Sequence, residues 1–152
     1  MALSKILCRT QPSSVVTSRL TLQPRGQGFV DITAEVTGLV EEIGAREGAL
    51  TLFIRHTSAS LTIQENADPS VLTDLSTVLA QMAPEDAKWT HKAEGPDDMP
   101  AHVKAMLTAT SLQIPVLNGE LMLGTWQAIY LIEHRRHPHN REVVLQFVGL
   151  VR

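Results

Sequence analysis

The sequence is poor in cysteine, in aromatic residues and in long apolar runs, and each shortage excludes a class of protein. The single cysteine, Cys8, cannot form an intrachain disulfide, so we expect a reducing cytoplasm as its location. No run of about 18 apolar residues occurs and the start is too polar for a signal peptide, so we expect neither membrane insertion nor export. The net charge of -3 gives no general attraction for nucleic acid or an anionic membrane, and neither is an expected partner.

The remaining composition is that of an ordinary globular protein. The 152 residues include 43% hydrophobic and 19% charged residues, so one core can form without disulfides or other covalent support. No repeat or low-complexity tract divides the chain. We therefore expect a single domain over residues 1–152, with 1–13 loosely ordered ahead of the first strand.

Hydrophobic periodicity predicts a mixture of strands and helices without strict alternation. Asn118-Gly119 predicts a hairpin within 114–133, because both residues tolerate positive φ. We expect strands over 14–22, 49–56, 60–65 and 141–152, and helices within 31–48, 68–84 and 100–111. This order indicates the α+β class with a largely antiparallel sheet.

Two of these segments carry sharper expectations. Residues 49–56 are almost continuously apolar, which predicts a strand covered on both faces, with 60–65 as its neighbour. The helix that follows Asp68 has a capping residue, a proline in its first turn at Pro69, and Pro84 to end it. Its apolar residues share one face, and we expect that face to be buried.

The first polar cluster follows the strand over 49–56. Side chains alternate along an extended chain, so His56, Ser58 and Ser60 would form one polar face. A serine beside a histidine suggests a nucleophile, but no nucleophile elbow is present, and a polar bend between two strands is the favoured alternative. The cluster consists of His56, Thr57, Ser58, Ser60, Glu65, Asn66 and Asp68.

The second polar cluster lies in the connection before Pro100. It comprises His91, Glu94, Asp97, Asp98 and His102. Two histidines and three carboxylates within twelve residues can converge on a divalent ion or act in proton transfer, although the spacing matches no specific zinc motif. The alternative is a solvated loop in which an aspartate caps the next helix.

Two further features lie near the C-terminal strand. Arg135 and Arg136 belong to a histidine-rich segment that can bind phosphate, and we expect most of it to form an exposed hairpin tip. Trp126 and Gln127 alternate along their strand, which predicts Trp126 in the core and Gln127 facing a pocket.

Three blocks of the sequence resemble the YjbQ-like family, whose members are described as secondary thiamine-phosphate synthases. The blocks are HTSASLTIQENADPSVLTDL, HKAEGPDDMPAHVKA and IPVLNGELMLGTWQAIYLIE. The resemblance covers nearly the whole chain from Ser14. It implies two packed sheets with flanking helices, a homotrimer, and one pocket to which polar residues of all three blocks contribute.

The loop before Pro100 departs from the family pattern. Pro96 and Met99 replace residues usual in the family, and Asp98 replaces a neutral amide with an anion. We expect the additional carboxylate to strengthen a cation site or to alter the substrate.

The resemblance implies an activity that joins a pyrimidine methyl diphosphate to a thiazole phosphate with release of pyrophosphate. A divalent metal ion, Mg²⁺ or Zn²⁺, is the expected cofactor, because the departing pyrophosphate needs charge neutralisation. The alternatives are a metal-dependent hydrolase of a small phosphorylated or acylated metabolite, and a non-catalytic trimer that binds a metabolite or metal. Expected catalytic residues are His56, Ser58, Glu65 and His102; expected metal ligands are His91, Asp97, Asp98 and His102; expected substrate-binding residues are Arg55, Thr57, Asn66, Gln127 and Glu133.

Overall fold

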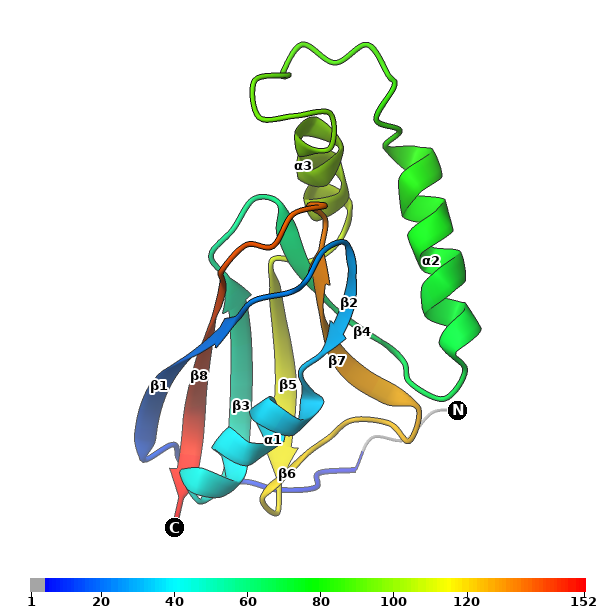
Figure 1. The fold of residues 1–152 in the computed structure, drawn as a ribbon. Helices are drawn as coiled ribbons and strands as arrows, with labels where there is room; N and C mark the ends of the chain where they lie inside the picture. The colour runs from blue at the N-terminus through cyan, green and yellow to red at the C-terminus, as the bar shows by residue number, and fades with distance from the viewer. Residues whose placement is uncertain (1–4) are drawn as a thin grey trace.

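The computed structural model describes residues 5–152, whose strands form two antiparallel sheets (Figure 1). The larger sheet has the order β1-β8-β3-β5-β6 and the smaller has the order β2-β7-β4. The strands are β1 (Ser14–Leu22), β2 (Gly28–Asp31), β3 (Ala45–Ile54), β4 (Ala59–Glu65), β5 (Ser111–Leu117), β6 (Glu120–Leu121), β7 (Gln127–Glu133) and β8 (Arg141–Val151); the helices are α1 (Thr33–Glu42), α2 (Pro69–Met82) and α3 (Asp98–Leu107). The predicted α+β class with antiparallel sheets is confirmed.

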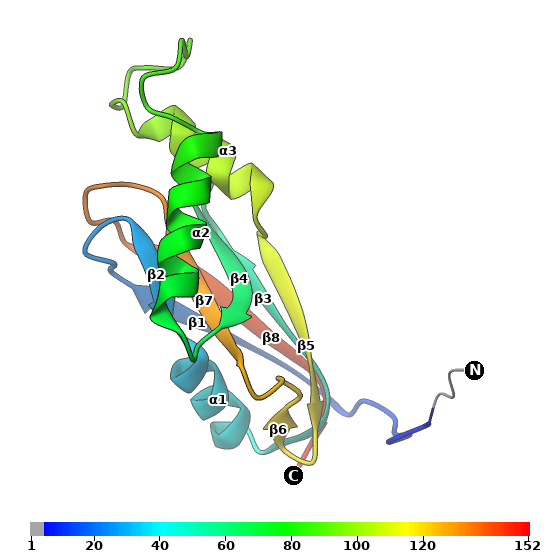
Figure 2. The same cartoon turned by 90° about the vertical axis from the view of Figure 1, so that its right-hand side faces the viewer.

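The hydrophobic core lies between the two sheets. On β3, Leu50, Leu52 and Ile54 face this core and are almost completely buried, whereas Phe53 is 49% exposed on the opposite face. The prediction that this strand is covered on both faces is therefore wrong, and Figure 2 shows α1 and α2 on the core side of the larger sheet. The expected neighbour is also wrong, because β3 pairs with β5 and β8 while β4 pairs with β7.

The hairpin predicted at Asn118-Gly119 joins β5 to β6. Both residues have positive φ, at 53° and 84°, as a tight two-residue turn requires. β6 has only two residues. The chain then leaves the larger sheet and enters the smaller one as β7, so the hairpin accounts for only part of the segment 114–133.

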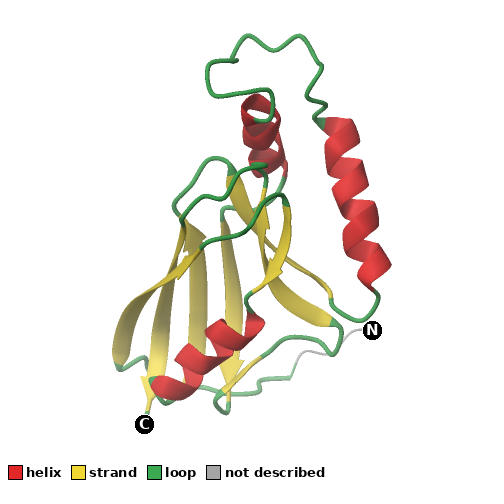
Figure 3. Cartoon of the chain, viewed as in Figure 1, coloured by secondary structure: helices red, strands yellow, loops and turns green. Residues whose placement is uncertain are grey.

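Helix α2 forms as its sequence predicts but is not buried as predicted. Asp68 caps it by accepting a hydrogen bond from the Ser70 N–H at 2.9 Å, and Pro69 is its first residue. None of its residues is fully buried, and Val78 and Met82 are 47% and 55% exposed. Figure 3 shows the helix at one side of the molecule. An open pocket separates its residues Leu75, Val78 and Leu79 from Phe29 and Ile132 of the smaller sheet.

Three segments meet at one end of the molecule and provide most of its polar chemistry. They are the β3–β4 loop (55–58), the β7–β8 loop (134–140), and α3 with the connection that precedes it (Figure 1). We call this region the loop end. No helix in the described part of the chain has the length and apolar character that a membrane crossing requires.

Candidate metal centre

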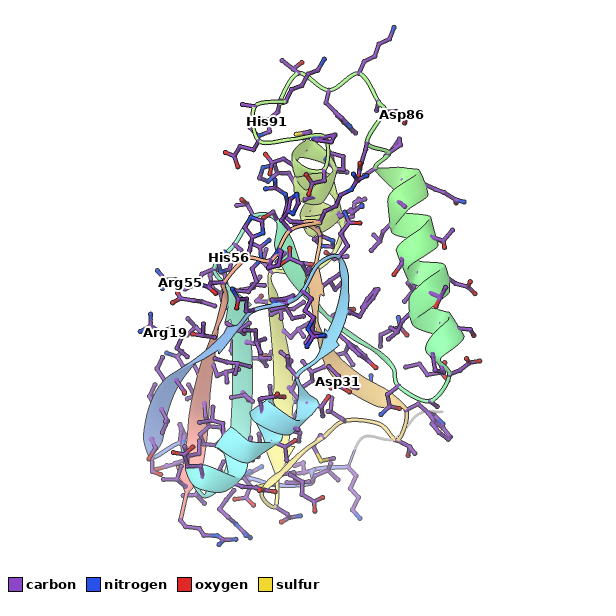
Figure 4. The ribbon with its side chains drawn as sticks, in the orientation of Figure 1. Arg19, Asp31, Arg55, His56, Asp86 and His91 are labelled. Carbon is purple, nitrogen blue, oxygen red and sulfur yellow. The ribbon has the colours of Figure 1, made fainter. Side chains whose placement is uncertain are left out.

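His91, Asp98 and His102 converge at the loop end and form the candidate metal centre. His91 Nε2 lies 2.7 Å from Asp98 Oδ2, and His102 Nε2 lies 3.5 Å from the same oxygen. One ligand atom from each residue lies within 4.8 Å of the others. Asp98 and His102 are one turn apart on α3, while His91 comes from the preceding connection (Figure 4).

The orientation of the His102 ring is fixed by the β3–β4 loop. His102 Nδ1 lies 2.9 Å from the Thr57 carbonyl oxygen, which can only accept, so Nδ1 carries the proton and donates it. The lone pair is consequently on Nε2, the nitrogen that faces Asp98. Histidines that bind metal ions usually have this arrangement, in which the second ring nitrogen donates to a carbonyl or carboxylate.

Arg135 holds the two neighbouring aspartates in different directions. Its Nη1 donates to Asp98 Oδ1 at 2.8 Å and its Nε donates to Asp97 Oδ2 at 3.0 Å. Burial opposes ionisation of Asp97, but hydrogen bonds from the Arg136 N–H and from Arg135 outweigh it and lower the pKa of that carboxyl. Asp97 is therefore paired with arginine, whereas Asp98 keeps one oxygen toward the two histidines.

A second arginine organises the interior beneath this centre. Arg141 donates to both carboxylate oxygens of Glu133, at 2.6 and 2.7 Å, and its Nη2 lies 3.0 Å from Ser58 Oγ. Arg141 and Glu133 are 3% and 1% exposed. The predicted roles of Ser58 and Glu133 thus fall on side chains that already have buried partners.

His56 and Arg55 lie at the rim of the loop end (Figure 4). His56 Nε2 accepts a hydrogen bond from the Glu142 N–H at 2.8 Å. Burial and the positive charge of Arg141 lower the pKa of His56, which keeps its ring neutral at neutral pH. Arg55 forms an ion pair with the Glu142 carboxylate at 3.0 Å.

The other predicted site residues lie at the opposite end of β4, which we call the Trp126 end. β4 begins where Ala59 pairs with Glu133 and ends where Glu65 pairs with Gln127. Trp126 is 64% exposed there, so its predicted core position is wrong. Glu65, Asn66 and Gln127 are not gathered with the histidines, and the expected single pocket does not form within one chain.

The sequence interpretation missed a buried polar group between α3 and β7. His134 Nε2 lies 2.8 Å from Ser60 Oγ, and Thr108 Oγ1 lies 2.6 Å from the same oxygen. Burial, with Lys104 and Arg141 nearby, lowers the pKa of His134 to about 3.

The predicted exposed tip also needs correction. Glu133, His134, Arg135 and Arg141 are all buried, and the exposed part of the turn is limited to residues such as Arg136 and His137. The acids and arginines that flank the turn were the available signal, but only the folded chain shows which of them pair.

The donor set fits a divalent transition metal. In tetrahedral zinc sites with bond lengths of about 2.0–2.1 Å, two ligand atoms lie roughly 3.3 Å apart. The 3.5 Å between His102 Nε2 and Asp98 Oδ2 is close to that value, and the 2.7 Å contact of His91 is shorter. The His91 side chain is 47% exposed, so it has room to move away from Asp98 toward that separation.

Sequence comparison finds similar proteins in several microorganisms. The sequence model described as "UPF0047 protein YjbQ-like" matches residues 18–150. A UPF0047 protein of Synechocystis is 49% identical over 133 residues, which cover 87% of this chain and 90% of the relative. The UPF0047 protein YjbQ of Escherichia coli O157:H7 is 39% identical over 131 residues, covering 86% and 95% of the two chains.

Solved structures show the same fold. A crystal structure from Sulfolobus solfataricus, titled as a protein of unknown function, has a TM-score of 0.83 at 25% identity and covers 90% of this chain and 99% of its own. An uncharacterised YjbQ/UPF0047 protein from Clostridium acetobutylicum has a TM-score of 0.79 at 38% identity, covering 86% and 98%. These likenesses support the two-sheet architecture.

Proposed function

The chain belongs to the UPF0047 family of YjbQ-like proteins, and we propose that it is a metal-dependent enzyme acting on a phosphorylated small molecule. One observation carries this proposal. The Thr57 carbonyl fixes the His102 ring so that its Nε2 faces Asp98 Oδ2, and His91 Nε2 approaches the same oxygen. Two imidazoles and a carboxylate arranged in this way are typical ligands of a catalytic metal ion.

The ligand types favour zinc over magnesium as the resident ion. Imidazole nitrogen suits zinc and other transition metals, whereas magnesium prefers oxygen ligands and retains several waters. Three protein ligands also leave a fourth position for water or substrate, as catalytic zinc sites do. We therefore assign His91, Asp98 and His102 as the ligands and leave Asp97 with Arg135.

The reaction we propose is a coupling of the thiamine-phosphate synthase type. The thiazole ring nitrogen forms a bond to the methylene carbon of the pyrimidine, while the bond from that carbon to the diphosphate oxygen breaks and pyrophosphate leaves with the electron pair. A bound divalent ion would supply charge neutralisation to the diphosphate oxygens. The protein has little else to alter covalently, so positioning and electrostatics account for most of the catalysis.

Residues of the loop end have defined roles in this proposal. Arg135 donates a hydrogen bond to Asp98 Oδ1, which leaves Oδ2 toward the histidines, and the Thr57 carbonyl keeps the proton of His102 on Nδ1. His56 has a neutral ring at the rim, where it can exchange a proton with substrate. Arg55 beside it can attract phosphate if Glu142 releases it.

Residues of the Trp126 end can contribute to the proposed reaction only if a second copy of the chain brings them to the loop end. They are separated from the histidines by the length of β4, about 20 Å for a strand of this size. We propose a homotrimer, which the uncovered apolar residues of α2, Val78 and Met82 among them, support. A monomer mass in light scattering would contradict this assembly.

The single cysteine of the chain supports a cytoplasmic location.

Metal content per chain is the first test. Elemental mass spectrometry of untagged protein should give close to one transition-metal ion per chain for the wild type. We expect His102→Ala and Asp98→Asn to lose it, because each removes a ligand. His137→Ala, at an exposed histidine of the β7–β8 loop, is the matched control and should keep it. Equal metal in the wild type and His102→Ala would contradict the assigned site.

The activity is tested separately with the two phosphorylated substrates. Formation of thiamine phosphate that is lost in the His102→Ala variant, with native assembly preserved, would support the coupling reaction. Release of phosphate or an acid without a coupling partner would favour the hydrolase instead. Saturable binding without product over a broad panel of phosphorylated compounds would favour a non-catalytic protein.

A further inference from the structure

A crevice lies between α2, α3 and the smaller sheet, away from the candidate metal centre. It has a volume of about 70 Å³, and its lining includes Gln27, Ser76, Ala80, Lys104 and His134. One water needs only about 10–15 Å³ on this measure, so the space admits a group of several heavy atoms. We call it the Lys104 crevice.

The lysine that lines this crevice is buried without a partner. Lys104 is 8% exposed, and within residues 5–152 no carboxylate oxygen lies within 4.0 Å of its ammonium group and its side chain has no hydrogen bond, so the nitrogen itself keeps contact with solvent in the crevice. Two acids act on Lys104 through their negative charge, and both already have an arginine partner: Glu85 pairs with Arg136, and Asp97 pairs with Arg135. A largely buried lysine without a counter-ion loses part of its hydration, and an anion in the crevice would offset that loss.

The histidine that lines the crevice has one ring nitrogen engaged and one available. Its Nε2 is held by Ser60 Oγ at 2.8 Å, and Ser60 Oγ is in turn 2.6 Å from Thr108 Oγ1. Thr108 Oγ1 also lies 2.8 Å from the Lys104 carbonyl oxygen, which can only accept, so Thr108 donates there, Ser60 donates to Thr108, and the proton of the neutral His134 ring is on Nε2, which donates to Ser60. In that arrangement Nδ1 is a hydrogen-bond acceptor for an occupant of the crevice.

Helical geometry separates this lysine from the metal ligands. Lys104 is two residues beyond His102 on α3, so the two side chains point roughly 200° apart around the helix axis. His102 faces the β3–β4 loop, whereas Lys104 faces α2 and β7. The crevice is therefore independent of the metal centre.

We propose that the Lys104 crevice binds a phosphate group, with the Lys104 ammonium as its charge partner and His134 Nδ1 accepting a hydrogen bond from a protonated phosphate oxygen. The group can belong to free inorganic phosphate or to a phosphorylated metabolite. Both present the same tetrahedral oxyanion, and a compact anion of this kind matches the point charge of a lysine. The proposal does not depend on the proposed metal centre or on the coupling reaction.

Isothermal titration calorimetry with inorganic phosphate at constant ionic strength tests the proposal. The wild type should show saturable binding in the millimolar range or tighter. Lys104→Met should weaken binding at least about tenfold, because a charge-assisted hydrogen bond is lost. Lys88→Met makes the same substitution at an exposed lysine and should bind as the wild type does. His102→Ala should also bind normally, which separates this site from the metal centre.

A second variant keeps the test decisive if Lys104→Met fails to fold. Ala80 is an exposed residue of α2 that lines the crevice, so Ala80→Leu fills the space while the lysine remains. We expect it to weaken phosphate binding to a similar extent. No saturable binding by the wild type, or wild-type affinity in either Lys104→Met or Ala80→Leu, would overturn the proposal.

A simple alkyl phosphomonoester distinguishes the two sources of the phosphate group. Ester binding at least as tight as that of inorganic phosphate, lost in Lys104→Met, would identify the crevice as a site for phosphorylated metabolites. Binding of inorganic phosphate alone would assign the crevice to the free anion.

Discussion

The two ends of β4 carry similar polar residues but use them in opposite ways. At the loop end, Glu133 and Arg141 are buried and hydrogen-bonded to each other. At the Trp126 end, Glu65 has no side-chain partner among the described residues, and Trp126 is largely exposed. Residue type alone therefore does not identify a site. One glutamate, Glu133, is buried and paired with an arginine, whereas the other, Glu65, is partly exposed and has no side-chain partner among the described residues.

Within the loop end, the residues that stabilise the fold differ from the residues that can bind a metal ion. Arg135 and Arg141 are fully engaged with acidic partners, and these pairs give the region its shape. His91 and His102, which are more exposed, are held at the edge of that network with a carboxylate between them. The buried ion pairs position the ligands, and the ligands are the groups that can meet a metal ion.

The largest expected effect comes from breaking the buried pair of the loop end. Glu133→Gln leaves Arg141 buried without a counter-charge, and losing one partner of such a pair costs about 3–5 kcal/mol in the free energy of unfolding. Urea unfolding at neutral pH measures this change.

Glu65→Gln makes the same substitution at the other end of the same strand pair. Because Glu65 has no side-chain partner in the described chain, we expect a change within about 0.5 kcal/mol. Similar losses in the two variants would show that the ends do not differ as described here.

The next largest effect is a pH dependence from the buried histidine. The unfolded chain binds a proton at His134 near the ordinary pKa of 6.5, whereas the folded chain binds it only near 3. Stability is therefore unaffected above pH 6.5 and falls as the pH is lowered through this window, by about 1.4 kcal/mol per pH unit for one proton.

His134→Gln should make this slope shallower by about one proton between pH 6 and pH 4, whatever its effect at neutral pH. His137→Gln, at an exposed position, is the control and should keep the wild-type slope. Urea unfolding at a series of pH values gives both slopes. An unchanged slope in His134→Gln would show that His134 takes up its proton in the folded chain as readily as in the unfolded one.

Local patterns predicted the elements whose causes are local. The strand over 14–22 has the same bounds in the structure because its side chains alternate strictly between half-buried and exposed. The cap at Asp68 and the turn at Asn118-Gly119 also form as predicted. Each of these depends on a few neighbouring residues.

Elements that depend on distant contacts were missed or misplaced. Residues 45–48 read as the end of a helix but begin β3, where Gly48 lies so close to β8 that an added Cβ would be 2.4 Å from the Val148 carbonyl oxygen. The short strand β2 was not predicted, because its pairing with β7 is not visible locally. The division into two sheets likewise depends on long-range pairing.

The same distinction holds for the candidate site. The spacing of His91, Asp98 and His102 indicated a cluster, and the structure brings them together, because two of them are one turn apart on a helix. The separation of Asp97 from that cluster depends on Arg135, which lies 38 residues away. Lys104 had no signal in the sequence, since an isolated lysine in a helix is ordinarily solvated.

The smallest expected effect on stability tests whether the Trp126 end is a free surface. Trp126 is 64% exposed, so Trp126→Phe should change the free energy of unfolding by less than about 0.5 kcal/mol. The other tryptophan, Trp89, donates its indole N–H to the Pro84 carbonyl at 2.9 Å and is less exposed. We therefore expect acrylamide to quench the wild type more strongly than Trp126→Phe, whose emission comes from Trp89 alone. If Trp126 is instead shielded from acrylamide and its replacement lowers the mass measured by light scattering, this end is a subunit contact. Its exposed polar residues would then be held in place by a second chain, as Glu133 and Arg141 hold each other within one chain.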